Sequence, residues 1–258
     1  MNAASGRFVW FDLMTTDIQA AKSFYSEIVG WQTTKWSGGD YEMWKAGDEE
    51  VGGVMALTSD ARQSGSPPQW LAYVGTNDVD STVRKAQALG GQVVTPARDI
   101  SNVGRFALLA DPQGAAFAIF QALGQESATP DATKLGHFGW AELNTTDWKS
   151  AWKFYSDLFG WQHTSSMDMG PEYGEYFMFG SDSNQAFGGM SNTASMMNAR
   201  PHWLYYVNVK NADDTARKIV EKGGKDVNGP MDVPGGGRIA QAVDPQGARF
   251  AIFAPAEQ

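Results

Sequence analysis

The sequence lacks cysteine altogether and has only three histidines among its 258 residues. Without cysteine the chain has no disulfide, thiolate nucleophile, iron–sulfur cluster or cysteine-based zinc site. Long hydrophobic runs are also missing, since no apolar stretch approaches the roughly 20 residues of a membrane-spanning helix. The first residues, Met1–Arg7, contain no apolar core of a signal peptide. We therefore expect a cytoplasmic protein that does not bind membranes.

Positive charge is scarce as well. Twenty Lys and Arg residues stand against 29 Asp and Glu, which gives a net charge of −9. A surface of this sign repels phosphate backbones, and no basic run compensates for it, so we expect no nucleic-acid partner. With 42% hydrophobic residues the chain has ample material for a packed core. Its length fits one large domain or two of ordinary size.

What the sequence does contain is an internal duplication. Short motifs from the first half recur in order in the second half, about 130 residues later. So many colinear identities do not arise by chance. The repeated motifs are Phe24-Tyr25 and Phe154-Tyr155, Gly30-Trp31 and Gly160-Trp161, Gly52-Gly53 and Gly188-Gly189, Gly104-Arg105 and Gly237-Arg238, and Asp111-Pro112-Gln113-Gly114 and Asp244-Pro245-Gln246-Gly247. The predicted domains are residues 1–122 and 135–258, joined by a polar linker at 123–134.

Each copy has the same predicted order of elements. In the first copy, apolar alternation and helical spacing predict two helices, Ile18–Ile28 and Val79–Leu89, among several strands. The predicted strands are Phe8–Leu13, Tyr41–Ala46, Gly52–Leu57, Trp70–Gly75, Arg105–Ala110 and Ala116–Gln121. This order fits two βαβββ units per copy, or one βαβββ unit followed by a further αββ. We predict an α+β fold of tandem modules, with curved mixed sheets around a concave pocket and helices outside.

The motifs resemble those of the vicinal oxygen chelate superfamily, which includes glyoxalases, bleomycin-resistance proteins and extradiol dioxygenases. The resemblance rests on Thr-Thr-Asp after the first strand, Phe-Tyr-x₄-Gly-Trp, and the later Asp-Pro-x-Gly turn, present in both copies. More narrowly, the chain resembles the tandem-domain glyoxalase-like proteins of bacteria. The superfamily spans isomerases, dioxygenases, thiol transferases and non-catalytic antibiotic binders, so the resemblance implies the βαβββ fold more firmly than a reaction.

The resemblance also implies where a divalent metal would bind. The family's ligands are a His or Glu on the first strand, a His on a middle strand and a Glu on the last strand. The matching positions hold Trp10 and Trp140, Leu71 and Leu204, and Ala118 and Ala251. None of these side chains coordinates a metal. We therefore expect no metal or other cofactor, with a divalent metal at a non-standard site as the alternative.

Three residues are candidates for catalysis. Asp12 and Glu142 lie two residues after the usual first-strand position and so point to the same face of the strand. His202 lies two residues before Leu204 and is the one imidazole that this geometry brings near a carboxylate, that of Glu142. The alternative is that Asp12 and Glu142 hydrogen-bond to neighbouring backbone or to an arginine, and that His202 is a partly exposed strand residue. His137 and His163 are expected at the surface.

The predicted ligand-binding residues are mostly aromatic. Trp10 and Trp140 lie on the concave face, and the alanines at the usual glutamate positions are expected to open an apolar slot between side chains of neighbouring strands. These residues either line a ligand pocket or fill the interior of the sheet. The remaining candidates are Tyr73, Tyr206, Phe120, Phe253, Arg105 and Arg238. The two arginines either hold an anionic group of a ligand or pair with Asp12 and Glu142.

The sequence thus favours a protein that binds a small hydrophobic or aromatic molecule without the usual metal site. The alternative is an enzyme of the lyase, isomerase or dioxygenase type that uses a non-standard metal site, or Glu142 or Asp12 as a general base. A third interpretation is a protein without pocket chemistry. Because the duplication supplies its own two-fold interface, we expect a monomer, with a homodimer as the alternative.

Overall fold

A computed structural model describes residues 5–39, 41–63, 65–124 and 131–256. The first copy contains β1 (Phe8–Thr15), α1 (Ile18–Val29), β2 (Gln32–Lys35), β3 (Glu42–Ala46), β4 (Glu49–Ala56), α2 (Ser59–Gln63), β5 (Gln69–Gly75), α3 (Val79–Ala88), β6 (Gln92–Ile100), β7 (Gly104–Ala110) and β8 (Ala116–Ala122). The second contains β9 (Phe138–Asn144), α4 (Trp148–Phe159), β10 (Gln162–Asp168), α5 (Gly170–Tyr173), β11 (Glu175–Gly180), β12 (Ala186–Ser191), α6 (Thr193–Met196), β13 (His202–Asn208), α7 (Ala212–Glu221), β14 (Lys225–Val233), β15 (Gly237–Val243) and β16 (Arg249–Ala254).

Each copy forms one eight-stranded mixed sheet, which confirms the predicted α+β fold. The strand orders are β2-β3-β4-β1-β5-β8-β7-β6 and β10-β11-β12-β9-β13-β16-β15-β14. Each copy is thus two βαβββ units, the first of the two interpretations. The sequence patterns missed β2, β6, β10 and β14, which are the outermost strands of the two sheets. Their burial is low because an edge strand has little to pack against, so the apolar alternation that reveals a strand is weak there.

The compact units of the chain cut across the two copies. One unit comprises residues 1–9, 72–129 and 140–203, and the other comprises 10–71, 130–139 and 204–258. Each unit therefore combines the first half of one copy with the second half of the other. Residues 125–130 of the predicted linker lie outside the described residues, and the predicted division at 122 and 135 stays a prediction.

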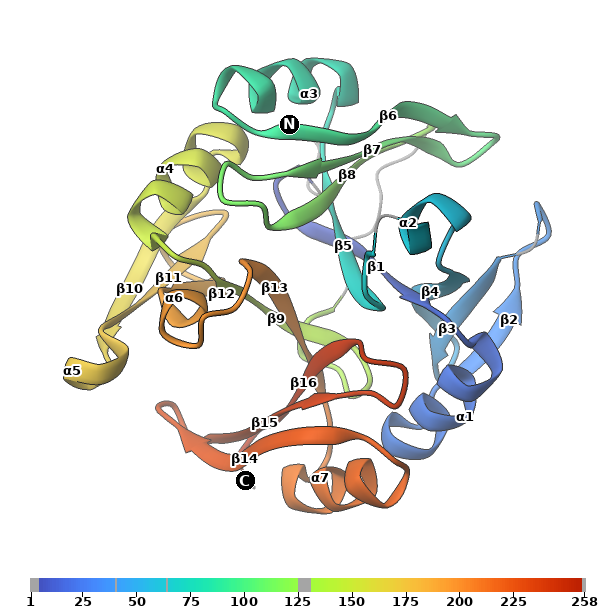
Figure 1. Ribbon diagram of the computed structural model, residues 1–258, viewed down its shortest axis with the longest axis vertical. Helices are drawn as coiled ribbons and strands as arrows, with labels where there is room; N and C mark the ends of the chain where they lie inside the picture. Colours follow the sequence, from blue (N-terminus) through green and yellow to red (C-terminus); the bar gives the residue numbers. More distant parts are fainter. Residues whose placement is uncertain (1–4, 40, 64, 125–130, 257–258) are drawn as a thin grey trace. The chain divides into compact units, whose positions relative to one another are not determined.

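The four strands of one βαβββ unit form one half of a sheet and are called a half-sheet below. Helices cover one face of these half-sheets (Figure 1): α3 lies along β6–β8 and α7 along β14–β16. Helix α1 begins where the Asp17 carboxylate accepts a hydrogen bond from the backbone N–H of Ala20, and it ends at Gly30, whose φ of 77° is left-handed. Helix α4 repeats this with Asp147 and Gly160. No helix in the part of the chain that the structure describes is long and apolar enough to cross a membrane.

The repeated tryptophans join the two copies within each unit. The indole of Trp31, on the first copy, donates to the carbonyl oxygen of Gly136, just before the first strand of the second copy, at 2.8 Å. Reciprocally, Trp161 donates to the carbonyl oxygen of Gly6 at 2.6 Å. Both indoles are buried. The Gly-Trp motif therefore holds each helix–strand turn against the start of the other copy.

The repeated tyrosines and aspartates form a second pair of links. Tyr25 donates its hydroxyl to Asp244 and Tyr155 donates to Asp111, both at 3.1 Å. The other carboxylate oxygen of each aspartate accepts backbone N–H groups of its own Asp-Pro-Gln-Gly turn. Burial raises the pKa of Asp111, of Asp244 and of Tyr25. The motifs that carry the family resemblance are thus mostly contacts between the copies.

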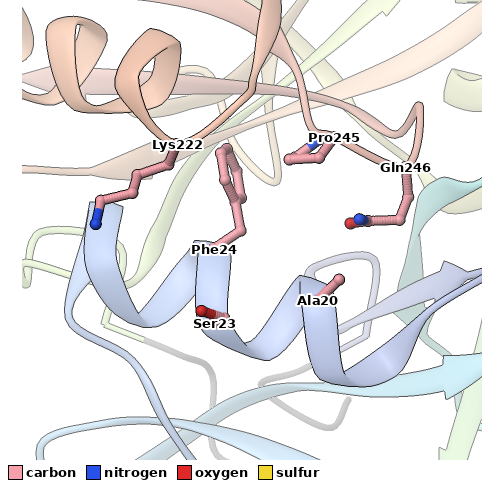
Figure 2. Close-up of a pocket in the computed structure, with 6 residues that line it drawn as sticks. All are labelled: Ala20, Ser23, Phe24, Lys222, Pro245 and Gln246. Carbon is pink, nitrogen blue, oxygen red and sulfur yellow. The ribbon is translucent and has the colours of Figure 1, made fainter.

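The glutamine of the same turn behaves differently in the two copies. Gln113 clamps the start of α4: its Oε1 accepts from the Thr146 hydroxyl at 2.6 Å and the Asp147 backbone N–H at 2.8 Å, and its amide donates to the Asp147 carbonyl oxygen at 2.8 Å. Gln246 instead lines a cavity of about 230 Å³ beside α1, together with Ala20, Ser23, Phe24, Lys222 and Pro245 (Figure 2). Its Oε1 is buried and has no hydrogen-bond partner among the described residues.

This difference predicts unequal effects on stability. We expect Gln113→Ala to lower the free energy of unfolding by about 1–3 kcal/mol, because three hydrogen bonds at the start of α4 are lost. The matched variant Gln246→Ala should change it by less than about 0.5 kcal/mol or stabilise the protein, since a buried acceptor without a partner is removed. Urea unfolding of both variants measures this, and equal losses would contradict it.

Candidate functional site

The first half-sheet carries a cluster of tryptophan, tyrosine and carboxylate. On β1 the side chains of Trp10 and Asp12 point to the same face, and the Trp10 indole donates to Asp12 Oδ1 at 3.0 Å. The Tyr41 hydroxyl, just before β3, donates to the same oxygen and lies 2.7 Å from the Trp10 indole nitrogen. Asp12 is only 3% exposed, whereas Trp10 and Tyr41 are half-buried. The two rings therefore form the accessible surface over a buried carboxylate.

A glycine makes this cluster possible. Gly53 on β4 lies directly opposite Asp12 in the parallel ladder between β1 and β4. A Cβ at Gly53 would lie 1.8 Å from the Tyr41 hydroxyl oxygen and 2.7 Å from Asp12 Oδ1. Only a residue without a side chain lets the tyrosine cross β4 to reach the carboxylate. The repeated Gly-Gly motif thus has a role in the site itself.

The second copy builds the same cluster with Glu142 in place of the aspartate. Trp140 donates to the Tyr176 hydroxyl at 2.9 Å, and that hydroxyl donates to Glu142 Oε2 at 3.1 Å. The amide of Asn144 donates to Glu142 Oε1, also at 3.1 Å. Gly189 lies opposite Glu142, and a Cβ there would lie 2.4 Å from the Tyr176 ring. The predicted alternative for both acids was hydrogen bonding to neighbouring backbone or to an arginine, whereas the donors found here are aromatic side chains and an amide.

The alanine at the usual glutamate position of the second copy does not open a slot. Ala118 and Ala251 are completely buried. Tyr206 and Gln241 are the ladder partners of Ala251 on its two sides, and the Gln241 amide donates to the Tyr206 hydroxyl at 2.9 Å, across the alanine. The prediction of vacated space was wrong at Ala251, because the side chains of Tyr206 and Gln241 meet across it. Tyr73 and Tyr206, the ladder partners of Ala118 and Ala251, are themselves buried.

Phe120 on β8 and Phe253 on β16 each lie over a glycine. A Cβ at Gly104 would lie 2.6 Å from the Phe120 ring, and one at Gly237 would lie 2.2 Å from the Phe253 ring. Both rings are half-buried. The matched Gly-Arg motifs therefore supply a flat surface against which each ring packs. Phe120 and Phe253 lie on β8 and β16, the last strand of each copy, where the sequence placed them.

The two arginines have partners other than those predicted. Arg105 binds Asp80 through two nitrogens, both at 2.9 Å, and Asp99 at 2.8 Å. Arg238 binds Asp213 and Asp232 in the same way. Hydrogen bonds to these aspartates raise the pKa of both guanidinium groups. The predicted pairing with Asp12 and Glu142 was wrong, because each arginine ties the first turn of a helix to the edge hairpin of its own half-sheet.

The three histidines differ in burial and in the groups that they contact. His202 Nδ1 lies 2.9 Å from the carbonyl oxygen of Arg200, at the start of β13. His163 is exposed, as predicted, and stacks on Phe177 with 4.4 Å between ring centroids. His137, in contrast, was expected at the surface and is only 3% exposed. Its backbone N–H donates to the carbonyl oxygen of Lys134 and its carbonyl oxygen accepts from Asn208, which fixes the residue directly before β9.

The buried His137 predicts a pH-dependent stability. Burial lowers the pKa of His137 below 6.5, although Glu49, 3.6 Å away, opposes this. The unfolded chain therefore binds a proton at a higher pH than the folded chain does. We expect the urea midpoint to fall as the pH drops below about 6.5, and the fall to be smaller in His137→Gln. Identical pH profiles of the two proteins would contradict this prediction.

The residues do not fit the metal of the family. An indole, an isobutyl group and a methyl group stand at the three usual ligand positions of each copy, and none of them donates an electron pair to a metal ion. Within residues 5–39, 41–63, 65–124 and 131–256 no group of three or more His, Asp or Glu could hold a metal. Glu142 and His202 lack a third ligand in that range, and Glu142 is already bound by Tyr176 and Asn144.

The family can now be stated from comparison with known proteins. The family model described as "Glyoxalase/Bleomycin resistance protein/Dioxygenase superfamily" matches residues 7–119 and 134–252. The chain belongs to this superfamily. The chain is 36% identical over 253 residues to the "Putative glyoxylase CFP32" of Mycobacterium tuberculosis, covering 96% of this chain and 95% of that protein. It is 31% identical over 262 residues to the "Anthracycline biosynthesis protein DauV" of Streptomyces sp. strain C5, covering 96% and 93%.

Solved structures of this superfamily share the fold. The Mn(II)-bound glyoxalase from Novosphingobium aromaticivorans has a TM-score of 0.66 at 15% identity, covering 98% of this chain and 83% of that one. Homoprotocatechuate 2,3-dioxygenase from Brevibacterium fuscum, in complex with 3,4-dihydroxyphenylacetate, has a TM-score of 0.65 at 13% identity, covering 97% and 81%. The resemblance stated from the motifs is confirmed, and at these identities the structures support the fold alone.

The sequence patterns missed the two tyrosines of the site. Tyr41 and Tyr176 do not share the offset of the neighbouring motifs, because the loops before them differ in length. A usable signal was present: each lies two residues before a methionine, Met43 or Met178, which is the ladder partner of Gly53 or Gly189. A strand alignment anchored on the Gly-Gly motifs would have placed both tyrosines beside the acids.

Proposed function

We propose that this superfamily member binds a small organic molecule with a flat apolar or aromatic body and a hydrogen-bond donor, without the superfamily's usual metal. The observation that carries the proposal is the half-buried tryptophan and tyrosine pair over a buried carboxylate, built on β1 with Tyr41 and again on β9 and β11. The rings offer an apolar face, and the carboxylate accepts a hydroxyl or an amine.

The absence of metal ligands at the usual positions supports a direct contact between protein and ligand. In this proposal the carboxylate orients the ligand by a charge-assisted hydrogen bond, which is about twice as strong as a neutral one. The relatives named for anthracycline biosynthesis suggest a polycyclic aromatic ligand. We therefore choose β-hydroxyanthraquinone as the probe, because its phenol lies away from its carbonyl groups and does not chelate metal ions.

Equilibrium dialysis of β-hydroxyanthraquinone tests the proposal. We expect saturable binding by the wild type and loss of binding in the double variant Trp10→Ala/Trp140→Ala. Tyr173, an aromatic residue that is 49% exposed, provides the control, and Tyr173→Ala should bind as the wild type does. Wild-type protein that does not retain the dye, or dye binding that survives in Trp10→Ala/Trp140→Ala, would contradict the proposal.

A second candidate function is proton abstraction next to a carbonyl group, with Asp12 or Glu142 as the base. The burial of both carboxylates favours it, because a dry site strengthens a base of this kind. The hydrogen bonds from Trp10 and Tyr41 to Asp12 Oδ1 argue against it, since this oxygen would have to release both donors in order to take up a proton. Deuterium exchange at the carbon next to the carbonyl of α-tetralone, followed by NMR in D₂O, decides the matter: exchange that is lost in Asp12→Asn would establish the base.

The proposal also includes an oligomeric state and a location in the cell. We keep a monomer as the working state, a homodimer as the alternative, a small molecule as the ligand, and a cytoplasmic location. Sedimentation of the purified chain distinguishes a mass of 28.0 kDa from twice that value.

A further inference from the structure

The two half-sites differ in one row of side chains. Next to the carboxylate row, the ladder between β1 and β4 pairs Met14 with Met55. At the matched place in the second copy, the ladder between β9 and β12 pairs Asn144 with Ser191. In both copies the row lies two residues beyond the acid on the same face, where successive side chains alternate. The two copies therefore share the acid, tryptophan, tyrosine and glycine and differ in this row, which is apolar in the first copy and polar in the second.

The methionines offer an apolar surface beside the Trp10 cluster. Met14 and Met55 are half-buried, and so is Met43, the ladder partner of Gly53 on β3. Figure 1 shows β3, β4 and β1 as neighbours in this half-sheet. Methionine side chains adapt their shape and make favourable contacts between sulfur and aromatic rings. A flat ring laid against Trp10 would meet them without leaving a polar group unsatisfied.

The polar row of the second copy is already used inside the protein. Asn144 is 5% exposed and its amide donates to Glu142, and Ser191 is 1% exposed with its hydroxyl 2.7 Å from that of Thr193. Both groups are buried and already hydrogen-bonded within the protein, so this row offers an aromatic ring no apolar side chain of the kind that Met14 and Met55 provide. Glu142 also has a side-chain donor, Asn144, where the first copy has Met14.

We propose that the two half-sites have different specificities: the half-site of Trp10, Asp12, Tyr41, Met14 and Met55 binds the flat aromatic ligand, and the half-site of Glu142 does not. Residues 14 and 55 determine the choice. The inference rests on the proposed function, because it assigns that function's ligand to one of two similar clusters. It gives a stoichiometry of one aromatic ligand per chain, although the chain is duplicated.

Equilibrium dialysis of β-hydroxyanthraquinone against the full chain tests this. We expect one equivalent bound at saturation, lost in Trp10→Ala and unchanged in Trp140→Ala. Met14→Asn and Met55→Ser, which place the second copy's residues in the first, should each weaken binding about tenfold or more. Met197→Asn, at a methionine that is 65% exposed, is the control and should have no effect. Circular dichroism confirms that each variant is folded. If a methionine variant does not fold, the two tryptophan variants still locate the site.

The outcomes separate this inference from the proposed function. Two equivalents, lost one at a time in Trp10→Ala and Trp140→Ala, would overturn the inference and leave the proposed function standing. One equivalent that disappears in Trp140→Ala would also overturn it, as would folded Met14→Asn and Met55→Ser variants with wild-type affinity. No binding by the wild type would overturn the proposed function itself.

Discussion

Gly53→Ala is expected to weaken the binding of β-hydroxyanthraquinone by roughly 10- to 100-fold, which corresponds to the loss of a hydrogen bond to a charged group. The new methyl group would lie 1.8 Å from the Tyr41 hydroxyl oxygen and 2.7 Å from Asp12 Oδ1, so Tyr41 must leave the carboxylate. The tyrosine then either blocks the face of the half-sheet or exposes Asp12 to water. Calorimetric titration of the variant with β-hydroxyanthraquinone measures the effect.

Two further variants separate the causes of that loss. Tyr41→Phe removes the hydroxyl and keeps the ring, so we expect a smaller loss of affinity than in Gly53→Ala. Gly189→Ala makes the matched change in the second copy, where a Cβ would lie 2.4 Å from the Tyr176 ring. On the specificity inferred above, it should leave the affinity unchanged. Wild-type affinity in Gly53→Ala would show that the contact between Tyr41 and Asp12 has no part in binding.

The second large effect is expected on stability. Asp244→Ala should lower the free energy of unfolding by at least about 3 kcal/mol, because several buried donors lose their acceptor at once. Asp244 Oδ1 accepts the backbone N–H groups of Gln246, Gly247 and Ala248, and its other oxygen accepts the Tyr25 hydroxyl. Urea or thermal unfolding provides the measurement. A loss below about 1 kcal/mol would contradict the role given to this link between the copies.

Control variants show whether the carboxylate charge matters. Asp157→Ala removes an exposed aspartate paired with Lys153 and should cost no more than about 0.5 kcal/mol. Asp244→Asn keeps an acceptor for the turn and removes the charge. Since burial raises the folded-state pKa of Asp244 above its unfolded value, ionisation destabilises the native state as the pH rises through that pKa. The free energy of unfolding of Asp244→Asn, relative to that of the wild type, should therefore be higher at pH 7 than at pH 3.

Local patterns in the sequence predicted the fold well where burial shapes them. Ala21, Phe24, Tyr25 and Ile28 recur at helical spacing because they are the buried face of α1. The edge strands β6 and β14 could not be found this way, because half or more of their side chains face solvent. The pairing of halves from different copies was also beyond the sequence, since it depends on contacts such as that of Trp31 with Gly136.

The site was predicted in part. Strand alternation placed Asp12 and Trp10 on one face, and their hydrogen bond follows from that. The partners of Arg105 could not be read from β7 itself, because Asp80 lies on α3, 25 residues earlier in the chain. The expected slot at Ala251 failed for a similar reason: Gln241 and Tyr206 come from two other strands and meet across the alanine. Residues of one strand are predictable together, and residues that a sheet brings together are not.

The claim that matters most is that the ligand contacts the protein directly rather than through a metal. The most direct measurement is the dissociation constant of alizarin, an anthraquinone with adjacent oxygens that a metal could chelate, for protein stripped with EDTA, before and after addition of Mn²⁺. With Trp10, Asp12 and Tyr41 as the binding groups, the constant is predicted to be the same in both conditions and to rise about tenfold or more in Asp12→Ala. Binding that requires Mn²⁺ and is indifferent to Asp12→Ala would contradict the account.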